Sequence, residues 1–311
     1  MDVRQLAALV AVADHGTFSA AARALFTVQS NVSSHVARLE RELGTTLVDR
    51  SAGRLTEDGT RVVERARRVL RELDDIAHDV RPGDGDIIGD VRVGILGTTG
   101  KWLLPRLLDA LRDQHPHLRP IITEGSSSTL LPTLDRYNGV IVHLPVDDPG
   151  VVIEPLYAED LVLVSPPDHP LADADSVSLA ALSGHPLLLP PAGSALRRVL
   201  DRAAGTLGVT LSAHAEVDGV RLLANLALAG QGATIVPATA VATLGIPPLV
   251  PPIAVTGLPP RVVALIYPRQ PSPSAATRAL FALLRETVTG LAEDQPGVHL
   301  GSDAVPLSRR G

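Results

Sequence analysis

The sequence of 311 residues contains no cysteine. This absence excludes disulfide frameworks, thiol nucleophiles, thiolate metal sites and thiol redox switches, and it fits a reducing compartment. Aromatic residues are scarce, with three Phe, three Tyr and one Trp, which argues against stacking platforms for single-stranded nucleic acid. Prolines interrupt the charge-free stretch 222–260, whereas a membrane span needs about 20 continuous apolar residues. We therefore expect a cytoplasmic protein without a membrane partner.

An excess of positive charge is also missing. Arg and Lys number 28 against 34 Asp and Glu, for a formal charge of −6, so a nucleic-acid function must rest on a local motif. Residues 1–56 hold six Arg and five acids. One copy of that segment would bind DNA weakly, and a dimer would be needed to engage two half-sites.

What the sequence does have is a helical N-terminal region. Apolar residues recur at helical spacing from Leu6, and Gly16 ends this first helix. Thr17 can cap a second helix over 18–25, and Thr27 opens a third that Gly44 closes. The apolar stripe of this third helix comprises Val28, Val32, Val36, Leu39 and Leu43. With a small hairpin expected over 47–55, the pattern predicts a helix-turn-helix unit.

The third helix carries a polar face beside its apolar stripe. Short hydroxyl and amide side chains and one long cation are the types that contact phosphates and base edges in the major groove. An ordinary solvated helix face is the alternative. The residues of this face are Gln29, Ser30, Ser33, Ser34 and Arg38.

A longer helix is expected from Thr56 to about Val80, before Pro82. Its apolar residues repeat at spacings of four and three, as in a coiled-coil seam. This favours a dimerising or domain-connecting helix over one packed on its own domain. The predicted seam consists of Val62, Ala66, Val69, Leu73, Ile76 and Val80.

The pattern changes after the polar linker 82–89. Strand and helix patterns then alternate, which predicts an α/β region with largely parallel sheets, either as one domain or as two lobes. Residues 292–311 are expected to form a disordered tail. The expected strands are 91–96, 121–123, 140–143, 161–165, 187–189, 215–217, 234–236 and 262–267.

Two strand-to-helix turns in this region are candidate anion sites. In the first, Gly94 to Gly100, the hydroxyls of Thr98 and Thr99 stand beside free backbone N–H groups and suit a carboxylate. In the second, Ser194 precedes a helix that carries Arg197. Ordinary helix caps are the alternative. Trp102 follows on the first turn of the same helix as Thr99, so its indole is expected near the mouth of the site.

An enzyme function finds little support in the same segments. The glycines at 94, 97 and 100 are spaced G-x-x-G-x-x-G, and no acidic residue follows at the distance that a dinucleotide ribose requires. The ten His lack metal-ligand spacing. Ser194 lies in no Gly-x-Ser-x-Gly elbow. We therefore expect no catalytic residue, no cofactor and no metal.

Residues 4–54, including DHGTFSAAARALFTVQSNVSSHVARLERELGTTLVDR, resemble the winged helix-turn-helix of LysR-type transcriptional regulators. The resemblance implies that Gln29, Ser30, Ser33 and Ser34 face DNA bases or nearby phosphates, that Arg38 is a further backbone contact and that Arg54 lies in the wing. Four positions depart from the family pattern. Ser30-Asn31 replaces a common Pro-Ala, Ser34 a basic or larger polar residue, and Val48 a Phe.

The resemblance continues more loosely to residue 290 through ITEGSSS, EDLVLVSPPDHPL, PPAGSALRRVLD and LANLALAGQGATIVP. It implies a two-lobed effector domain like periplasmic binding proteins, although the usual Gly-x-Leu-Asp is absent around 136–142. Lobe I would comprise 90–160 and 267–291, and lobe II 161–266. The resemblance places at the inter-lobe cleft Thr98, Thr99, Ser126, Ser194 and Arg197.

The sequence thus predicts an α plus α/β protein that regulates transcription in response to a ligand. We expect a winged helix-turn-helix over 1–56, a dimerising linker helix over 57–81, a flexible linker over 82–89 and an effector domain over 90–291. The expected partners are double-stranded DNA, a small organic acid or other anion, and a second copy of the chain, as a homodimer through the linker helix or a homotetramer. The alternative is an enzyme or a metabolite-binding protein.

Overall fold

The computed structural model describes residues 1–51, 53–79, 87–241 and 251–300. The chain divides into two compact units, the N-terminal unit Met1–Gly85 and the C-terminal unit Asp86–Gly311. Across the described residues no helix is long and apolar enough to cross a membrane. Within the same ranges, no group of three or more His, Cys, Asp or Glu side chains could hold a metal ion.

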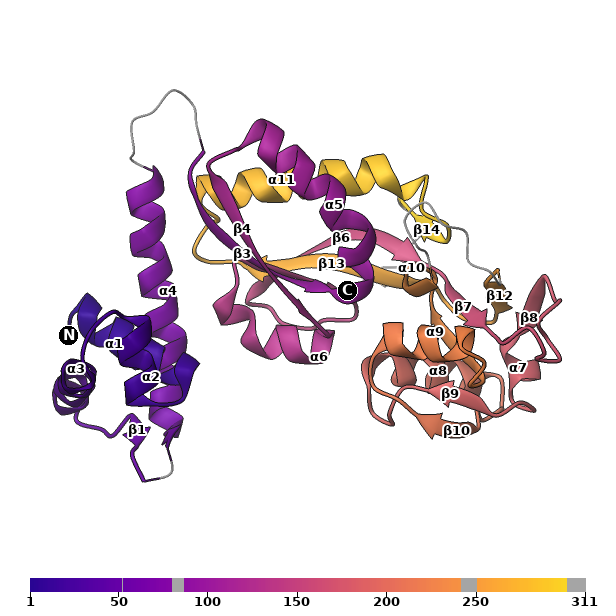
Figure 1. Ribbon diagram of the computed structural model, residues 1–311, viewed down its shortest axis with the longest axis horizontal. Helices are drawn as coiled ribbons and strands as arrows, with labels where there is room; N and C mark the ends of the chain where they lie inside the picture. The colour runs from indigo at the N-terminus through magenta and orange to yellow at the C-terminus, as the bar shows by residue number, and fades with distance from the viewer. Residues whose placement is uncertain (52, 80–86, 242–250, 301–311) are drawn as a thin grey trace, which may run out of the picture. The chain divides into compact units, whose positions relative to one another are not determined.

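The N-terminal unit forms the predicted three helices and hairpin (Figure 1). Asp2 and Gln5 make a capping box at the start of the first helix, and Gly16 ends it in the left-handed conformation. The third helix begins two residues after Thr27, because Val28 is its N-cap. The elements are α1 Val3–His15, α2 Phe18–Ala24, α3 Gln29–Leu43, β1 Val48–Asp49, β2 Arg54–Leu55 and α4 Glu57–Asp79.

Helix α4 has two differently packed halves. Val63 and Ala66 are buried in the core of the unit, so Ala66 does not belong to the exposed seam that the sequence predicted. The distal part of the helix extends beyond α1–α3 (Figure 1), and there Val69, Leu73 and Ile76 are 45%, 40% and 58% exposed. The start of the helix therefore packs on its own domain, whereas its end presents an apolar row that no other described residue covers. A dimer through that row stays a prediction. Val80 and most of the predicted linker lie outside the described residues.

The C-terminal unit contains two six-stranded sheets, each covered by helices on both faces. The sheet of the first lobe has the order β14-β6-β13-β5-β3-β4, and that of the second lobe β10-β9-β11-β7-β12-β8. Both sheets are mixed rather than largely parallel, because β13 runs antiparallel to β5 and β6, and β7 antiparallel to β11 and β12. The strands are β3 Gly89–Leu96, β4 Leu118–Gly125, β5 Gly139–His143, β6 Val151–Glu159, β7 Leu161–Val164, β8 Ser176–Ser178, β9 Leu187–Leu189, β10 Ala213–Glu216, β11 Ala233–Pro237, β12 Ile253–Thr256, β13 Arg261–Pro268 and β14 Val298–His299.

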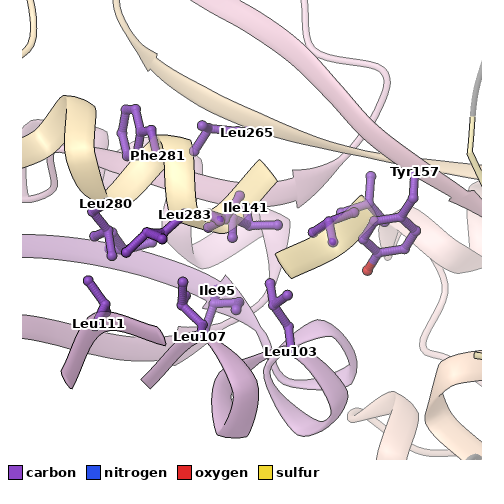
Figure 2. Close-up of a cluster of buried hydrophobic side chains, with 14 of the residues drawn as sticks. Ile95, Leu103, Leu107, Leu111, Ile141, Tyr157, Leu265, Leu280, Phe281 and Leu283 are labelled. Atoms are coloured by element: carbon purple, nitrogen blue, oxygen red, sulfur yellow. The ribbon is translucent and has the colours of Figure 1, made fainter. Parts of the chain in front are cut away.

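Two long helices cover one face of the first sheet (Figure 2). Leu103 and Leu107 of α5 (Gly97–Gln114) meet Leu280 and Leu283 of α11 (Ala275–Ala292) over the sheet residue Ile95. The opposite face carries α6 (Ser127–Leu130) and a 3-10 helix, η1 (Leu131–Arg136). In the second lobe, α7 (Leu179–Leu182) and α8 (Ala195–Thr206) cover one face, and α9 (Val220–Leu228) and α10 (Ala238–Val241) the other.

Within the described residues, two segments cross between the lobes. Asp160 joins β6 to β7, and residues 257–260 join β12 to β13. Because all of β13 pairs in the first sheet, the second crossing precedes Arg261, and the boundary predicted between 266 and 267 is wrong. The predicted tail is also partly ordered, since Val298 is buried and β14 pairs with β6. Residues 301–311 lie outside the description.

Candidate DNA-binding helix and effector cavity

Helix α3 separates its apolar and polar side chains as the sequence predicts. Val32, Val36 and Leu39 are buried in the N-terminal unit. This orientation leaves Gln29, Ser30, Ser34 and Arg38 exposed and Ser33 half-buried. The predicted contact residues therefore lie on the accessible part of one helix, and they are of the types that contact base edges and phosphates in the major groove.

Arg50 adds a cation to this surface, a role for which it was not singled out in the sequence. Its Nη1 donates to Ser33 Oγ at 3.2 Å, and its guanidinium carbon lies 5.3 Å from the centre of the Phe18 ring. Glu40 lies 3.9 Å from Arg50 and accepts backbone N–H bonds from Leu47 and Val48. These contacts tie the hairpin to α3. Ser33 and Arg50 are seventeen residues apart in the sequence, so no local sequence pattern predicts their contact.

Arg54, the predicted wing residue, is exposed on β2 and pairs in register with Asp49 of β1. The hairpin is short, with two residues in each strand. It thus presents Arg54 at the edge of the unit, where a phosphate contact is sterically open.

The C-terminal unit contains a cavity of about 500 Å³ between its lobes. The first lobe contributes residues of α6, η1 and β5 with its following turn, and the second lobe contributes α8 and the crossing segment before β13. The lining residues are Ser127, Ser128, Leu131, His143, Leu144, Pro145, Ala195, Arg198, Val199, Arg202, Ala203, Thr206, Leu207, Gly257 and Pro259.

The cavity combines an apolar wall with one sign of charge. Arg198 and Arg202 lie four residues apart on α8, so they share one helix face, and both are exposed. Ser127 and Ser128 supply hydroxyls from the first lobe. Among the described residues that line the cavity, none is acidic. Such a site can hold an anionic group at the arginines and an apolar body against the leucines and prolines.

His143 lines the same cavity at the end of β5. Burial lowers the pKa of its imidazole to about 4, and the positive charges of Arg261 and Arg198 act in the same direction. The ring is therefore neutral at pH 7. A neutral imidazole can both donate and accept a hydrogen bond, so His143 adds a polar contact without adding charge.

Thr98 and Thr99, predicted to bind an effector, do not line this cavity. Both are buried at the start of α5. Thr98 Oγ1 accepts from Arg261 Nη2 at 3.3 Å, and the Thr99 hydroxyl lies 2.6 Å from that of Tyr157. Either threonine would have to exchange an internal hydrogen bond before it could contact a ligand in the cavity.

Ser126, Ser194 and Arg197 also lie outside the cavity lining. Ser126 forms a capping box at α6, and the Ser194 hydroxyl accepts from the Arg197 backbone N–H. The Arg197 guanidinium pairs with Asp201 and Glu216, each at 2.9 Å. Ser126 and Ser194 thus act as helix caps, the alternative left open by the sequence, while their sequence neighbours Ser127 and Ala195 reach the cavity.

The predicted position of Trp102 at the cleft mouth is wrong. Its side chain is 3% exposed and belongs to the core of the first lobe. The indole packs edge-on against Tyr157 with ring centres 5.3 Å apart. Trp102 does follow Thr99 on the same helix, but the side of α5 that carries Trp102 packs into the core of the first lobe.

Comparison with known families matches both units. Residues 3–60 match the model described as bacterial regulatory helix-turn-helix protein, lysR family. Residues 84–289 match the LysR substrate binding domain. The second match alone spans more than half of the chain.

Individual relatives agree with the family models. The DNA-binding transcriptional dual regulator OxyR of Escherichia coli (strain K12) is 32% identical over 248 residues, which cover 78% of this chain and 80% of that protein. A probable hydrogen peroxide-inducible genes activator of Streptomyces viridosporus is 35% identical over 244 residues, covering 76% and 78%.

Solved structures share the fold along nearly the whole chain. A cysteine-to-aspartate variant of full-length OxyR from Pseudomonas aeruginosa superposes with a TM-score of 0.76 at 24% identity, covering 97% of this chain and 99% of that one. Full-length CbnR complexed with its target DNA gives a TM-score of 0.64 at 25% identity, covering 93% and 99%.

Proposed function

Because the chain belongs to the LysR family of DNA-binding transcription regulators, we propose that it binds a small organic anion in the cavity between its lobes. The observation that carries this proposal is that Arg198 and Arg202 lie on the same wall of the cavity, and that none of the described lining residues is acidic. The chain is a transcription regulator that responds to an effector, and its relatives are regulators rather than enzymes.

The composition of the cavity supports an anion with an apolar body. Its volume of about 500 Å³ lies within the range of small-molecule sites. The two guanidinium groups suit a carboxylate, whereas Leu131, Leu144 and Val199 offer apolar contact. A ligand that touches Ser127 on one lobe and Arg198 on the other would stabilise one arrangement of the lobes over another.

The names of several relatives refer to hydrogen peroxide, and two solved relatives carry a substituted cysteine. This chain has no cysteine, and Met1 is its single methionine. Oxidation of a thiol therefore has no target within the 311 residues. We propose that the signal to this chain is the non-covalent binding of a ligand.

For the N-terminal unit we propose that α3 enters the major groove and that Gln29, Ser30, Ser33 and Ser34 contact bases or nearby phosphates. Arg38 and Arg54 would contact the phosphate backbone. We further propose a homodimer through the apolar row of α4, with assembly of dimers into a tetramer as the other possible state, and a cytoplasmic location. Effector binding would then change the spacing of two DNA-binding units and hence the DNA bend.

A ligand screen tests the cavity. The full chain is titrated with a panel of aliphatic and aromatic mono- and dicarboxylates, and binding is followed by the rise in unfolding temperature. We expect Arg198→Gln and Arg202→Gln each to weaken the best ligand by about 1.5–3 kcal/mol, the range for a hydrogen bond to a charged group. Arg106→Gln, an exposed position on α5 outside the cavity lining, is the matched control and should bind normally. Wild-type affinity in both Arg198→Gln and Arg202→Gln would refute the proposed site.

A further inference from the structure

The turn between α2 and α3 presents an aromatic ring to solvent. The Phe26 side chain is 98% exposed, and it is flanked by the exposed Leu25 and Val28. With three phenylalanines in the whole sequence, one of them makes no core contact. Burial of an aromatic side chain is among the larger apolar contributions to stability, so the fold gains nothing from this ring.

The backbone at Phe26 is also held in a conformation that disfavours phenylalanine. Its φ is +51°, and it is the one non-glycine residue with positive φ among those that the structure describes. The Thr27 N–H donates to Ala22 O at 2.9 Å and the Phe26 N–H to Arg23 O at 3.2 Å. This pair of bonds is a Schellman motif, in which the left-handed position is usually glycine. The two bonds fix the ring's point of attachment instead of leaving a flexible loop.

Folding alone would therefore select glycine or asparagine at position 26. A phenylalanine there is both unburied and strained. An exposed aromatic residue on a rigid turn has the properties of a contact residue for another molecule.

The adjacent chain indicates which molecule. Val28 is the N-cap of α3 and Gln29 is its first residue, so Phe26 stands at the end of α3 whose first turns reach base edges in helix-turn-helix proteins. Arg23, one turn earlier on α2, adds an exposed cation. In the major groove the apolar feature of a base edge is the thymine C5-methyl group, which Phe can contact.

We propose that Phe26 contacts thymine methyl groups beside the bases read by α3, and so contributes an apolar specificity element to operator recognition. This proposal rests on the proposed role of α3. The DNA duplex, rather than a protein surface, is the partner of Phe26 because the ring stands directly before the DNA-binding helix.

The test begins with a duplex that the wild-type chain selects from a random-sequence library. The dissociation constants of wild type, Phe26→Gly and Phe26→Asn are then measured on that duplex, alongside their unfolding temperatures. We expect both variants to unfold at an equal or higher temperature, because the strained position is relieved, and to bind the duplex about 10- to 100-fold more weakly, because the burial of a phenyl ring is lost. Leu43→Ser is the matched control: it removes an exposed apolar side chain at the far end of α3, roughly 20 Å away by the helical rise, and should leave affinity unchanged.

A second arm identifies the contacted group. Single thymines of the duplex are replaced by uracil, which removes only the methyl group. At one or two positions wild type should lose affinity, whereas Phe26→Gly should show no further loss there.

Uracil effects of equal size in both proteins, or equal affinity of Phe26→Gly and wild type, would overturn the proposal while leaving α3 as the DNA-binding helix. A variant that alters self-association and leaves DNA affinity intact would assign the ring to a protein contact and also overturn it. Failure of the wild-type chain to select any duplex would instead refute the role of α3.

Discussion

The hydroxyl of Thr99 lies 2.6 Å from the hydroxyl of Tyr157 inside the first lobe of the C-terminal unit. Both side chains are buried, and Trp102 packs against the Tyr157 ring. Burial and the nearby Glu159 carboxylate raise the pKa of Tyr157, so its hydroxyl stays protonated. The threonine that the sequence suggested as an anion ligand thus makes an internal hydrogen bond that joins α5 to β6.

Thr99→Val should therefore reduce stability more than it reduces ligand binding. The change leaves the Tyr157 hydroxyl buried and without that partner, which costs about 1–3 kcal/mol of the free energy of unfolding. Adding Tyr157→Phe removes the hydroxyl that has lost its partner and should recover part of the lost free energy of unfolding. Denaturant unfolding of the two single variants and the double variant measures the coupling. Unchanged stability together with a lost carboxylate response would instead return Thr99 to the effector site.

A second buried contact spans the two crossings between the lobes. Arg261, the first residue of β13, pairs at 2.5 Å with Glu159, the last residue of β6, and both side chains are buried. Thr239 of α10 in the second lobe donates to the same carboxylate, and Thr98 of the first lobe accepts from the same guanidinium. The Arg261–Glu159 ion pair is therefore hydrogen-bonded to residues of both lobes.

Arg261→Met should destabilise the C-terminal unit by about 3–5 kcal/mol, because it leaves the Glu159 carboxylate buried without a counter-charge. The double variant Arg261→Met with Glu159→Gln should be less destabilised, since no uncompensated charge then remains. Urea unfolding of the full chain measures both. Equal losses in the single and double variants would show that the hydrogen bonds, rather than the charge, dominate.

The elements of the N-terminal unit were predictable because their signals are local. The stripe of Val32, Val36 and Leu39 fixes which face of α3 is buried, and Gly16 and Gly44 mark helix ends by their left-handed conformation. The expected strands lacked β6, β8, β12 and β14. The longest of these, β6, carries the sequence VVIEPLYAE, in which Pro155 and two glutamates obscure the alternation expected of a strand.

The cavity was less predictable because it depends on rotation about one helix. Arg197 and Arg198 are adjacent in sequence, but adjacent helical residues point about 100° apart. The first turns toward Glu216 and the second lines the cavity. One partner of Arg197, Asp201, is a local i,i+4 neighbour, but the other, Glu216, comes from β10, nineteen residues away, where no local pattern reveals it. Ser126 and Ser127 differ in the same way, because Ser126 caps α6 whereas its sequence neighbour Ser127 lines the cavity.

His143 predicts a pH dependence of stability. Its pKa is lowered from 6.5 to about 4 in the folded chain, so between these values the unfolded chain binds more protons than the folded one. The stability associated with the neutral ring is complete above about pH 6.5 and is lost as the pH falls toward 4, by roughly 3 kcal/mol at most.

Thermal unfolding at pH 7 and pH 5 should show this loss in wild type and a smaller loss in His143→Asn. His115→Asn, at the C-terminal end of α5, is the matched control and should behave as wild type. If His143→Asn loses as much stability as wild type between the two pH values, other groups cause the effect.

The two halves of α4 predict opposite outcomes for the same substitution. Leu73 is exposed in the apolar row at the end of α4, so Leu73→Asp should leave the monomer folded and prevent the proposed dimer, because a charge in the core of that dimer would cost several kcal/mol. Ala66 lies in the core of the unit, so Ala66→Asp should unfold it. Sedimentation with circular dichroism separates the two. A Leu73→Asp chain that stays dimeric at low micromolar concentration would move the dimer contact elsewhere.

Helix α3 and the hairpin should contribute differently to DNA binding, α3 to sequence specificity and the hairpin to affinity for the phosphate backbone. Gln29→Ala should weaken binding to a selected duplex by about 1–3 kcal/mol and relax specificity at one position, because an amide can read a base edge. Ser33 accepts a hydrogen bond from Arg50, so Ser33→Ala both removes a hydroxyl and releases that cation. Arg50→Gln should lower affinity for all sequences and reduce the salt dependence of binding by about one phosphate contact. Binding isotherms from about 50 to 200 mM salt, with Arg112→Gln in the other unit as control, measure both quantities. A salt slope unchanged in Arg50→Gln would mean that Arg50 only positions Ser33, and a Gln29→Ala variant that binds as wild type would remove the first turn of α3 from the recognition surface.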